Sequence, residues 1–251
     1  KNLDFFLMTI LEGNLYAVNL LAKKRPFMPD HHSLGAYEVY ALKTGMKCNP
    51  IPELRFKKCE KEDMPSVVRF LNENGRNFQF YPVTTEEDFT AENKHGPSYK
   101  DFYVIVDATG QIAACGAVWD QAKYKQYIVK GYGGLLKAIA PFSFLLPRFG
   151  YPDMLAKPDT VLNFFTLSYW AVRDNNPTLF EYFLKNISRT STAFSFFVIG
   201  VHEKNSFKKV LTGIPHFSYK SKIFMVDWDK SGDKRKSLDG NITPYLECGT
   251  L

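Results

Sequence analysis

The sequence is poor in the features that mark metal-binding, membrane-spanning and secreted proteins. Its four cysteines include no Cys-x-x-Cys pair and have no histidine at ligand spacing, so no metal site is expected. The most apolar stretch, residues 135–146, contains a lysine and a proline and is shorter than the roughly 18–20 residues of a transmembrane helix. No charged leader precedes residues 3–11, which are predicted to form a buried strand. These absences predict a cytoplasmic protein without a membrane span.

A concentrated patch of basic residues is also lacking, which makes a nucleic-acid partner unexpected. The 251 residues carry 32 Lys+Arg and 26 Asp+Glu, a net charge of +6, and the basic residues are scattered. Their densest cluster, residues 230–236, lies in a Ser-, Gly- and Asp-containing stretch that is typical of a solvated loop. By contrast, 16% of the residues are aromatic and 45% are apolar. This composition excludes a disordered or collagen-like chain and predicts one large or two small globular domains.

A short internal repeat occurs at an offset of 191 residues. Residues 5–20 align with residues 196–211, and five of the sixteen positions are identical. In both copies an apolar strand is followed by Glu-x-Asn, a helical stretch, a Pro-Phe turn and a second strand, predicted at residues 37–43 in the first copy and from residue 222 in the second. The asparagine is suited to cap the helix. If the repeat is genuine, residues 1–50 are the C-terminal remnant of a first domain that packs on a complete second domain, residues 51–251. The alternative is a chance match between two unrelated strand–helix–strand units.

Apolar runs and turn residues predict the elements of the second copy. Their order is strand, helix, helix, three strands, helix, strand, helix, two strands. The predicted bounds are strand 53–59, helix 64–74, a short helix from residue 84, strands 102–106 and 112–119, an apolar helical segment within 131–158, strand 162–172, helix 177–189, strand 193–201, helix 206–212, and strands 223–228 and 243–248.

Two segments of the sequence resemble motifs of a known superfamily. Residues 14–27 resemble the N-x-x-A-x-x-L-Y-x-K-x-G-F element of the GNAT acyltransferases, and residues 205–217 resemble a more diverged version of it. Trp119-Asp120-Gln121, Lys125-Gln126 and Tyr132 resemble a run in a tandem-domain bacterial branch of that superfamily. The resemblance implies an α/β fold of layered α+β character, the GNAT-like acyl-CoA N-acyltransferase fold, with a mixed, mostly antiparallel central sheet flanked by helices.

The resemblance also implies a reaction and a co-substrate. GNAT enzymes transfer an acyl group, usually acetyl, from CoA to an amine, so acetyl-CoA or another acyl-CoA is implied, with a small-molecule or peptide amine as acceptor. The pantetheine arm is implied to lie between two parallel strands that separate, near Trp170, Ala171 and Val172. The pyrophosphate is implied to lie at the next helix N-terminus, where unpaired N–H groups attract anions. The other residues implied for cofactor binding are Arg173, Asn176, Thr178, Leu179 and Asn205.

The expected phosphate-binding loop departs from the superfamily pattern. The pattern Q/R-x-x-G-x-G/A is replaced by residues 173–178 (RDNNPT), which contain neither glycine. Asp174 adds a negative charge near the pyrophosphate, and Pro177 removes an N–H donor. The tyrosine that commonly protonates the departing CoA thiolate is replaced by Thr212. Cofactor binding is expected to be weakened, and a non-catalytic GNAT-fold module that binds a ligand or partner is the alternative to an acyltransferase.

Few groups are candidates for proton transfer. A base that accepts the amine proton near neutral pH is best supplied by histidine or by a carboxylate with a raised pKa. His202 and Glu203 follow predicted strand 193–201, and Asp120 and Tyr132 flank the expected acceptor cleft. Structural alternatives stay open for both sets: a strand-end histidine bonded to the backbone, and a strand-end turn at Asp120.

The segment 133–147 is unusually apolar for a connection between strands. Two interpretations are open: it forms the roof of a pocket for an aliphatic or lipid-like substrate, or it packs on the sheet or on the first copy. Exposure of its side chains would also suit a lipid acyltransferase that works at a membrane surface.

Overall fold

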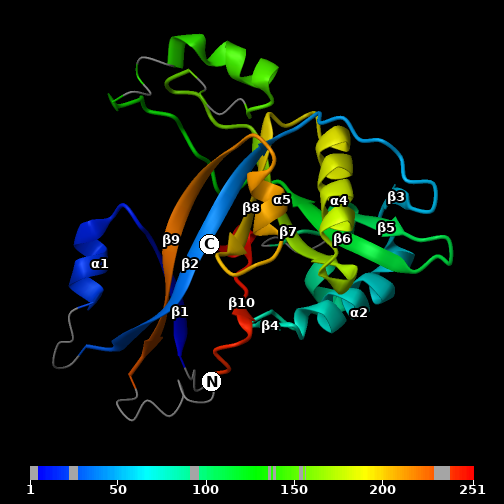
Figure 1. The fold of residues 1–251 in the computed structure, drawn as a ribbon, viewed down its shortest axis with the longest axis horizontal. Helices are drawn as coiled ribbons and strands as arrows, with labels where there is room; N and C mark the ends of the chain where they lie inside the picture. Colours follow the sequence, from blue (N-terminus) through cyan, green and yellow to red (C-terminus); the bar gives the residue numbers. More distant parts are fainter. Residues whose placement is uncertain are drawn as a thin grey trace.

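The computed structural model describes residues 5–22, 28–90, 96–134, 137, 140–152, 155, 157–228 and 238–251. An eight-stranded sheet of order β1-β9-β2-β8-β7-β6-β5-β3 crosses the molecule (Figure 1). Its strands are β1 Phe6–Leu11, β2 Asp30–Lys43, β3 Arg55–Lys58, β5 Phe102–Val106, β6 Ile112–Trp119, β7 Phe164–Val172, β8 Phe196–His202 and β9 His216–Asp227. Neighbouring strands are antiparallel except β7 and β8, which are parallel. This architecture confirms the predicted mixed, mostly antiparallel sheet.

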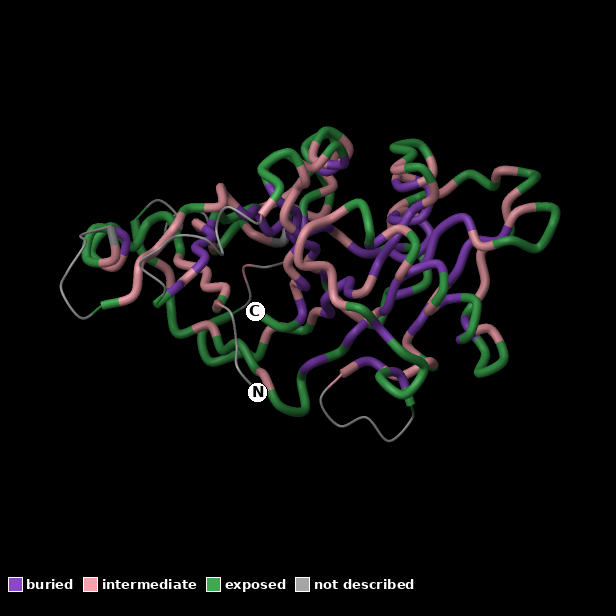
Figure 2. The backbone as a smooth tube through the Cα atoms, turned by 90° about the horizontal axis from the view of Figure 1, so that it is seen from below, coloured by how far each residue is buried: buried purple, intermediate pink, exposed green. Residues whose placement is uncertain are grey.

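Helices cover both faces of the sheet. The α-helices are α1 Leu15–Ala22, α2 Met64–Gly75, α4 Pro177–Thr190 and α5 Lys208–Thr212. The 3-10 helices are η1 Lys61–Asp63, η2 Glu86–Phe89, η3 Tyr99–Asp101, η4 Ala140–Phe149, η5 Arg173–Asn175 and η6 Cys248–Thr250. Buried side chains of α4 and α5 pack on β7, β8 and β2 on one face, whereas α2 packs on β5, β6 and β7 on the other. Burial is greatest along the central strands (Figure 2), whereas β1 is half-exposed and α1 is largely exposed.

The helix α4 illustrates how the sequence fixes an element. Asn176 caps it, Pro177 occupies the first turn, and buried apolar residues recur at Phe180, Phe183 and Leu184. Asparagine caps and first-turn prolines are typical of helix starts, and this spacing places the apolar residues on one face. The predicted helix 177–189 is therefore confirmed to within one residue.

The register of four strands is symmetric about one residue pair. Tyr37 of β2 lies opposite Ser221 of β9. Leu11 of β1 also lies opposite Ser221, and His202 of β8, which is 191 residues after Leu11, lies opposite Tyr37. If β1 is replaced by β8 and β9 by β2, the pair Leu11–Ser221 becomes the pair His202–Tyr37, so the register is the same. The two strand–helix–strand units, β1-α1-β2 and β8-α5-β9, occupy equivalent places in the sheet.

Three expectations about elements were wrong. The predicted strand 243–248 is not part of the large sheet: only β10 (Thr243–Pro244) is extended, paired in parallel with β4 (Phe78–Gln79), and η6 follows. The place beside β8 is taken by β2, which begins at Asp30 rather than at residue 37. The strand expected to be buried at residues 3–11 is the half-exposed edge strand β1, and residues 1–4 lie outside the described residues.

The apolar segment 133–147 contains much of η4. Phe142 of this segment is 61% exposed, and Phe149 at the end of η4 is 70% exposed, so packing on the sheet does not cover them. The segment is attached to the sheet through Lys43, whose ammonium donates to the main-chain oxygen of Pro147 at 2.8 Å. Residues 135, 136, 138 and 139 lie outside the described residues. In the part of the chain that the structure describes, no helix is both long enough and apolar enough to cross a bilayer.

Candidate functional site

The strands β7 and β8 separate along their length. They pair over only three residues of each strand, although β7 continues to Val172 and β8 continues to His202. Tyr169 has a φ of 47°, a left-handed conformation that is uncommon for a residue with a side chain, and the pairing of β7 with β6 shifts register beside it. This separation of two parallel strands is the arrangement that the resemblance implies for an acyl-CoA site.

A carboxylate of the C-terminal segment lies at this separation. Glu247 accepts hydrogen bonds from the main-chain N–H of Tyr169 at 2.8 Å and from the hydroxyl of Tyr245 at 2.7 Å. It also accepts one from the N–H of Gly249 at 3.1 Å. Burial raises the pKa of Glu247, although these hydrogen bonds oppose the rise. Sequence reasoning missed Glu247, for which the one signal is an acidic residue within the otherwise uncharged run 242–251.

The N-terminus of α4, where the pyrophosphate was expected, is capped by its own side chain. The side-chain oxygen of Asn176 accepts from the N–H of Thr178 at 2.9 Å and from that of Leu179 at 3.1 Å. The N–H of Phe180 donates to the main-chain oxygen of Asn176 at 3.0 Å. Pro177 has no N–H. A phosphate at this helix end therefore has to displace the Asn176 side chain.

Arg173 also has partners within the protein. Its guanidinium donates to a carboxylate oxygen of Asp107 at 2.7 Å and to the main-chain oxygen of Ile112 at 2.6 Å. Asp174 and Asn175 adopt φ values of 55° and 49°, the left-handed conformation that the missing glycines would adopt without strain. The loop thus keeps a turn of the backbone but directs its arginine to the β5–β6 hairpin.

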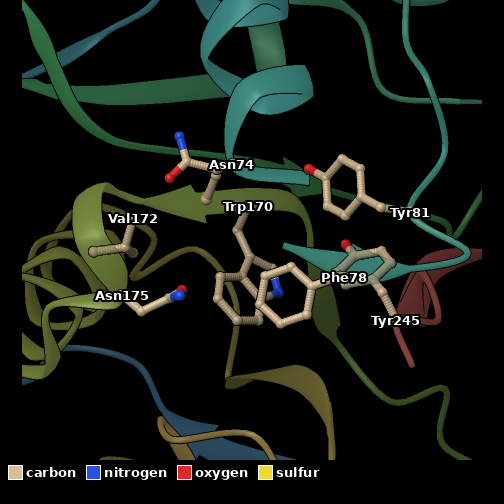
Figure 3. A pocket seen from close by; sticks show the side chains of 8 residues that line it. Asn74, Phe78, Tyr81, Trp170, Val172, Asn175 and Tyr245 are labelled. Carbon is tan, nitrogen blue, oxygen red and sulfur yellow. The ribbon is translucent and has the colours of Figure 1, made fainter. Parts of the chain in front are cut away.

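The predicted pantetheine-binding residues face packed surroundings. Trp170 packs on Phe180 and Phe207, with ring centroids 5.2 and 5.6 Å away. Trp170, Ala171 and Val172 line a cavity of about 10 Å³, the space of one water molecule, beside the end of α2 (Figure 3). A larger hollow of about 370 Å³ lies along α4, and Lys47, Thr178 and Lys185 are among its lining residues.

His202 and Glu203 hold the bulge of β2. The ring Nε2 of His202 lies 2.9 Å from the main-chain oxygen of Leu34, and its Nδ1 accepts from the N–H of Lys204 at 3.2 Å. These partners assign a neutral ring protonated on Nε2, and burial lowers the pKa of His202. Glu203 accepts from the N–H of Ala36 at 3.1 Å. Their part in proton transfer stays a prediction, and both side chains have structural partners.

Asp120 lies away from the predicted residues at the end of β7. Asp120 follows Trp119, which is paired with Thr166 near the start of β7, whereas Arg173 follows the end of β7. At about 3.3 Å per residue, roughly 20 Å of strand separates these points. Asp120 accepts from the N–H of Ala122 at 2.9 Å, a strand-end turn, and Tyr132 is half-buried. The structure therefore divides the predicted site between the two ends of β7.

The asparagine of each repeat caps a helical turn. Asn14 accepts from the N–H of Ala17 at 3.2 Å, and Asn205 accepts from the N–H of Phe207 at 2.9 Å. Asn205 therefore has a local structural partner, and its predicted contact with CoA stays a prediction. The hydroxyl of Thr212 donates to the main-chain oxygen of Lys208 within α5 at 3.0 Å.

A cavity of about 540 Å³ lies on the sheet face opposite α4 and α5. Five strands, the segment 121–127 and the C-terminal residues line it. Sequence reasoning missed this cavity because its lining comes from strands that are distant in sequence. No group of three or more His, Cys, Asp or Glu residues is placed to hold a metal ion within the described ranges.

Comparisons with known proteins agree on the fold. No family model and no curated protein matches the sequence. A GCN5-related N-acetyltransferase from Sphaerobacter thermophilus aligns over 99% of this chain at 8% identity with a TM-score of 0.52. A conserved protein of unknown function from Staphylococcus epidermidis aligns over 89% of this chain and 73% of its own, at 7% identity with a TM-score of 0.50.

Saccharomyces cerevisiae N-myristoyltransferase with bound myristoyl-CoA aligns over 88% of this chain at 10% identity with a TM-score of 0.47. The chain spans 64% of the length of the Sphaerobacter protein and 51% of the length of the yeast enzyme. The strand order, the separation of β7 from β8 and the similarity to the Sphaerobacter structure together show that this chain has the fold of the GCN5-related N-acetyltransferases.

Proposed function

We propose that this chain acts in acyl transfer of the GNAT type, with acetyl-CoA or a longer acyl-CoA as donor and a small-molecule or peptide amine as acceptor. In this reaction the amine nitrogen attacks the thioester carbonyl, the C–N bond forms, the C–S bond breaks, and CoA leaves as the thiol with the proton that the amine loses. The observation that carries the proposal is the separation of β7 from β8 in a chain of this fold.

The proposed donor site lies between the ends of β7 and β8 and the start of α4. Trp170, Ala171 and Val172 would face the pantetheine arm, and Arg173, Asn176, Thr178 and Leu179 would lie nearest the phosphates, with Asn205 across from them. Support comes from the hollow along α4, where Lys47 and Thr178 are among the lining residues and Lys185 is paired with Glu181 at 2.6 Å. His202 or Glu203 at the same sheet edge, or Asp120 and Tyr132 at the other end of β7, would accept the amine proton.

The setting of this chemistry is proposed to be the cytoplasm. All four cysteines are free. Two of them, Cys59 and Cys115, are buried, and burial raises the pKa of the Cys59 thiol to about 12. Unreactive, unpaired cysteines support a reducing compartment.

A thermal-shift titration with acetyl-CoA, and with longer acyl-CoAs, tests the proposal. A ligand that binds only the folded state raises the unfolding free energy by about 2.7 kcal/mol at a hundredfold excess over Kd. The variant Asn176→Gly frees the N–H groups of Thr178 and Leu179. A glycine in place of the capping asparagine lowers protein stability by only about a few tenths of a kcal/mol. We therefore expect Asn176→Gly to bind acyl-CoA more tightly than the wild type.

The matched control is Asn14→Gly, which removes the equivalent cap from α1 and should leave acyl-CoA binding unchanged. A saturable shift that Asn176→Gly strengthens supports a donor site at α4. Turnover is then measured as CoA thiol released in the presence of a set of amines. Binding with no release of CoA for any amine would contradict the acyltransferase proposal.

A non-catalytic GNAT-fold module is the second candidate function. It is favoured by the self-capped start of α4, by the internal partners of Arg173 and by the position of Glu247 at the main-chain N–H of Tyr169. Each of these takes a group that would otherwise contact the donor. If neither the wild type nor Asn176→Gly shows a saturable shift with any acyl-CoA, this candidate becomes the better supported one.

A further inference from the structure

The large cavity is built from the alternation of side chains along five strands. Each of β1, β2, β7, β8 and β9 contributes two lining residues spaced by two, such as Tyr37 and Val39 of β2 and Phe196 and Val198 of β8. Successive side chains of a strand point to opposite faces, so the intervening residues point away from the cavity, and two of them, Phe165 and Phe197, belong to the core under α4 and α5. The cavity floor is therefore a continuous part of the sheet, held rigidly by strand pairing.

The cover of this floor is made of irregular chain. On this face α2 covers the β5–β7 end of the sheet, whereas the segment 121–127 and the C-terminal residues 248–251 lie at the cavity. They are fixed by specific bonds: Gln121 donates to the main-chain oxygen of Gly249 at 2.6 Å, and the Tyr37 hydroxyl donates to that of Leu246 at 2.9 Å. The cavity is open on one side, and its volume of about 540 Å³ lies in the range of small-molecule sites.

The lining is mostly apolar. Aromatic rings come from Tyr37, Tyr127, Phe164, Phe196 and Tyr219, and no Asp or Glu is among the described lining residues. Burial raises the pKa of Tyr219 and that of Cys248 to about 12 each, so both side chains are uncharged at neutral pH. The charged side chain of the lining is Lys125.

The ammonium of Lys125 has capacity for a further partner. It contacts the main-chain oxygen of Leu251 and lies 5.7 Å from the centroid of the Tyr127 ring. An ammonium group has three donors, so a ligand oxygen can be accepted in addition. A cation at the border of an apolar cavity favours a ligand that joins an apolar body to an anion.

We propose that this cavity binds an apolar carboxylic acid, with its aliphatic or aromatic body against the rings of the sheet face and its carboxylate at Lys125. Hydroxyl groups of Thr9 and Ser221 supply polar contacts inside the cavity. The site is separate from the start of α4, and the inference holds whether or not acyl-CoA binds there.

Three probes with one body and different head groups test the proposal: octanoate, 1-octanol and octylamine. Each is titrated into isotopically labelled protein at pH 7, and Kd is obtained from the amide chemical shifts. Octanoate should bind most tightly and octylamine most weakly. Octylamine binding that equals or exceeds octanoate binding, or the absence of saturable octanoate shifts, would overturn the proposal.

Substitution of the lysine isolates the carboxylate contact. Lys125→Gln should weaken octanoate binding about tenfold, to the level of octanol, because a charge-assisted hydrogen bond is lost. The matched control is Lys130→Gln, since Lys130 is exposed, pairs with Asp159 at 2.9 Å and is absent from the lining. Equal effects of the two substitutions would overturn the assignment of the anion to Lys125.

Two substitutions that fill the cavity, each on a different strand, test whether octanoate binds in it. Val198→Phe on β8 and Ser221→Phe on β9 each place a ring in the cavity and should abolish the octanoate shifts. Dispersed amide spectra show whether each variant is folded, and the Lys125→Gln comparison decides the matter if neither is. Unchanged octanoate affinity in a folded filling variant would show that the acid binds elsewhere.

Discussion

Single residues without side chains let the C-terminal segment approach the sheet. A Cβ atom at Gly200 would overlap the hydroxyl and ring of Tyr37, and one at Gly249 would overlap the ring of Trp119. The Tyr37 ring stands over Gly200 and its hydroxyl holds the main chain at Leu246. The C-terminal segment can therefore contact the sheet because Gly200 and Gly249 have no Cβ atom. Their backbone does not adopt a conformation that itself favours glycine.

Gly200→Ala is expected to destabilise the protein by about 1–3 kcal/mol, because the added methyl group displaces Tyr37 and its hydrogen bond. Urea unfolding followed by circular dichroism measures the change. Gly240→Ala is the control, since nothing lies within 4 Å of the position of its added Cβ. Equal stability of the two variants would contradict the packing described for Tyr37.

Glu247 gives a pH dependence of known sign. Its pKa in the folded protein is raised above the ordinary 4.5, so the unfolded chain loses the proton first as the pH rises. The unfolding free energy contributed by this group then falls between pH 4.5 and the raised pKa, and it stays constant above that value. Glu247→Gln lacks this titration. We expect the stability of Glu247→Gln relative to wild type to increase with pH across this window, measured by urea unfolding at several pH values. Parallel curves for the two proteins would show that Glu247 does not titrate in this way.

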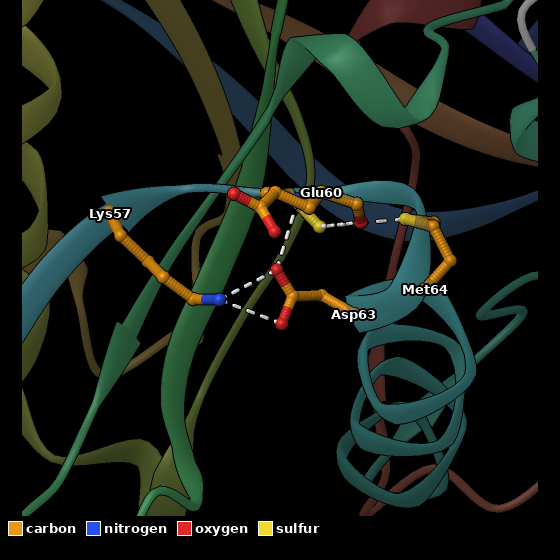
Figure 4. Close-up of polar contacts among 5 residues, drawn as sticks. Lys57, Glu60, Asp63 and Met64 are labelled. Carbon is orange, nitrogen blue, oxygen red and sulfur yellow. Dashed lines mark hydrogen bonds and ion pairs between the residues drawn. The ribbon is translucent and has the colours of Figure 1, made fainter.

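At the scale of elements, side chains stabilise the start of η1, the 3-10 helix that leads directly into α2. Asp63 accepts from the Lys57 ammonium at 2.7 Å and from the N–H of Glu60 at 2.9 Å (Figure 4). Burial opposes its ionisation, but the hydrogen bonds from Lys57 and Glu60 lower the pKa of Asp63. The contribution of this pair is therefore present at neutral pH and is lost as the pH falls through that lowered pKa.

Asp63→Ala should lower the unfolding free energy by about 1–2 kcal/mol, since it removes a capping carboxylate and a partly screened ion pair. Thermal unfolding at pH 7 measures the loss, which should shrink at acidic pH. Asp159→Ala is the matched control: Asp159 also pairs with a lysine, but both partners are more than three quarters exposed, so little change is expected. If Asp159→Ala lowers the unfolding free energy as much as Asp63→Ala does, burial of the ion pair does not explain the effect of Asp63→Ala.

At the scale of the whole molecule, β2 lies inside the sheet formed by the rest of the chain. It pairs with β8 on one side and β9 on the other, so the sheet of residues 51–251 is continuous only through a strand from residues 1–50. The symmetric register of β1-α1-β2 and β8-α5-β9 supports the proposal that the two units are repeats of one domain type, with residues 1–50 and 51–251 belonging to different copies.

Hydrogen exchange tests this arrangement. Because β2 is paired on both sides, its amides from residue 37 to residue 43 should open together with those of β8 and β9, at free energies near that of global unfolding. Amides of α1, which is mostly exposed, should exchange earlier and serve as the internal comparison. Early exchange of β2 with β8 still protected would show that residues 1–50 form a separate folding unit.

The sequence by itself determined the elements and the type of fold. Helices such as α2 and α4 are specified by local signals, a cap, a first-turn proline and a regular apolar spacing, which act within a few residues. Strands β5 to β8 follow from apolar runs with turn residues between them. The resemblance of two segments to GNAT motifs then implied a mixed sheet flanked by helices.

Only the tertiary structure decided which strands are neighbours and which side chains meet. The insertion of β2 beside β8, the exclusion of residues 243–248 from the sheet and the division of the predicted site residues between two ends of β7 all depend on pairing between distant segments. The cavity at Lys125 and the burial of Glu247 arise in the same way. Caps, turns and apolar spacing act within a few residues, so they can be recognised in the sequence alone. Strand pairing and burial depend on the free energy of the whole chain, so they are decided only in the tertiary structure.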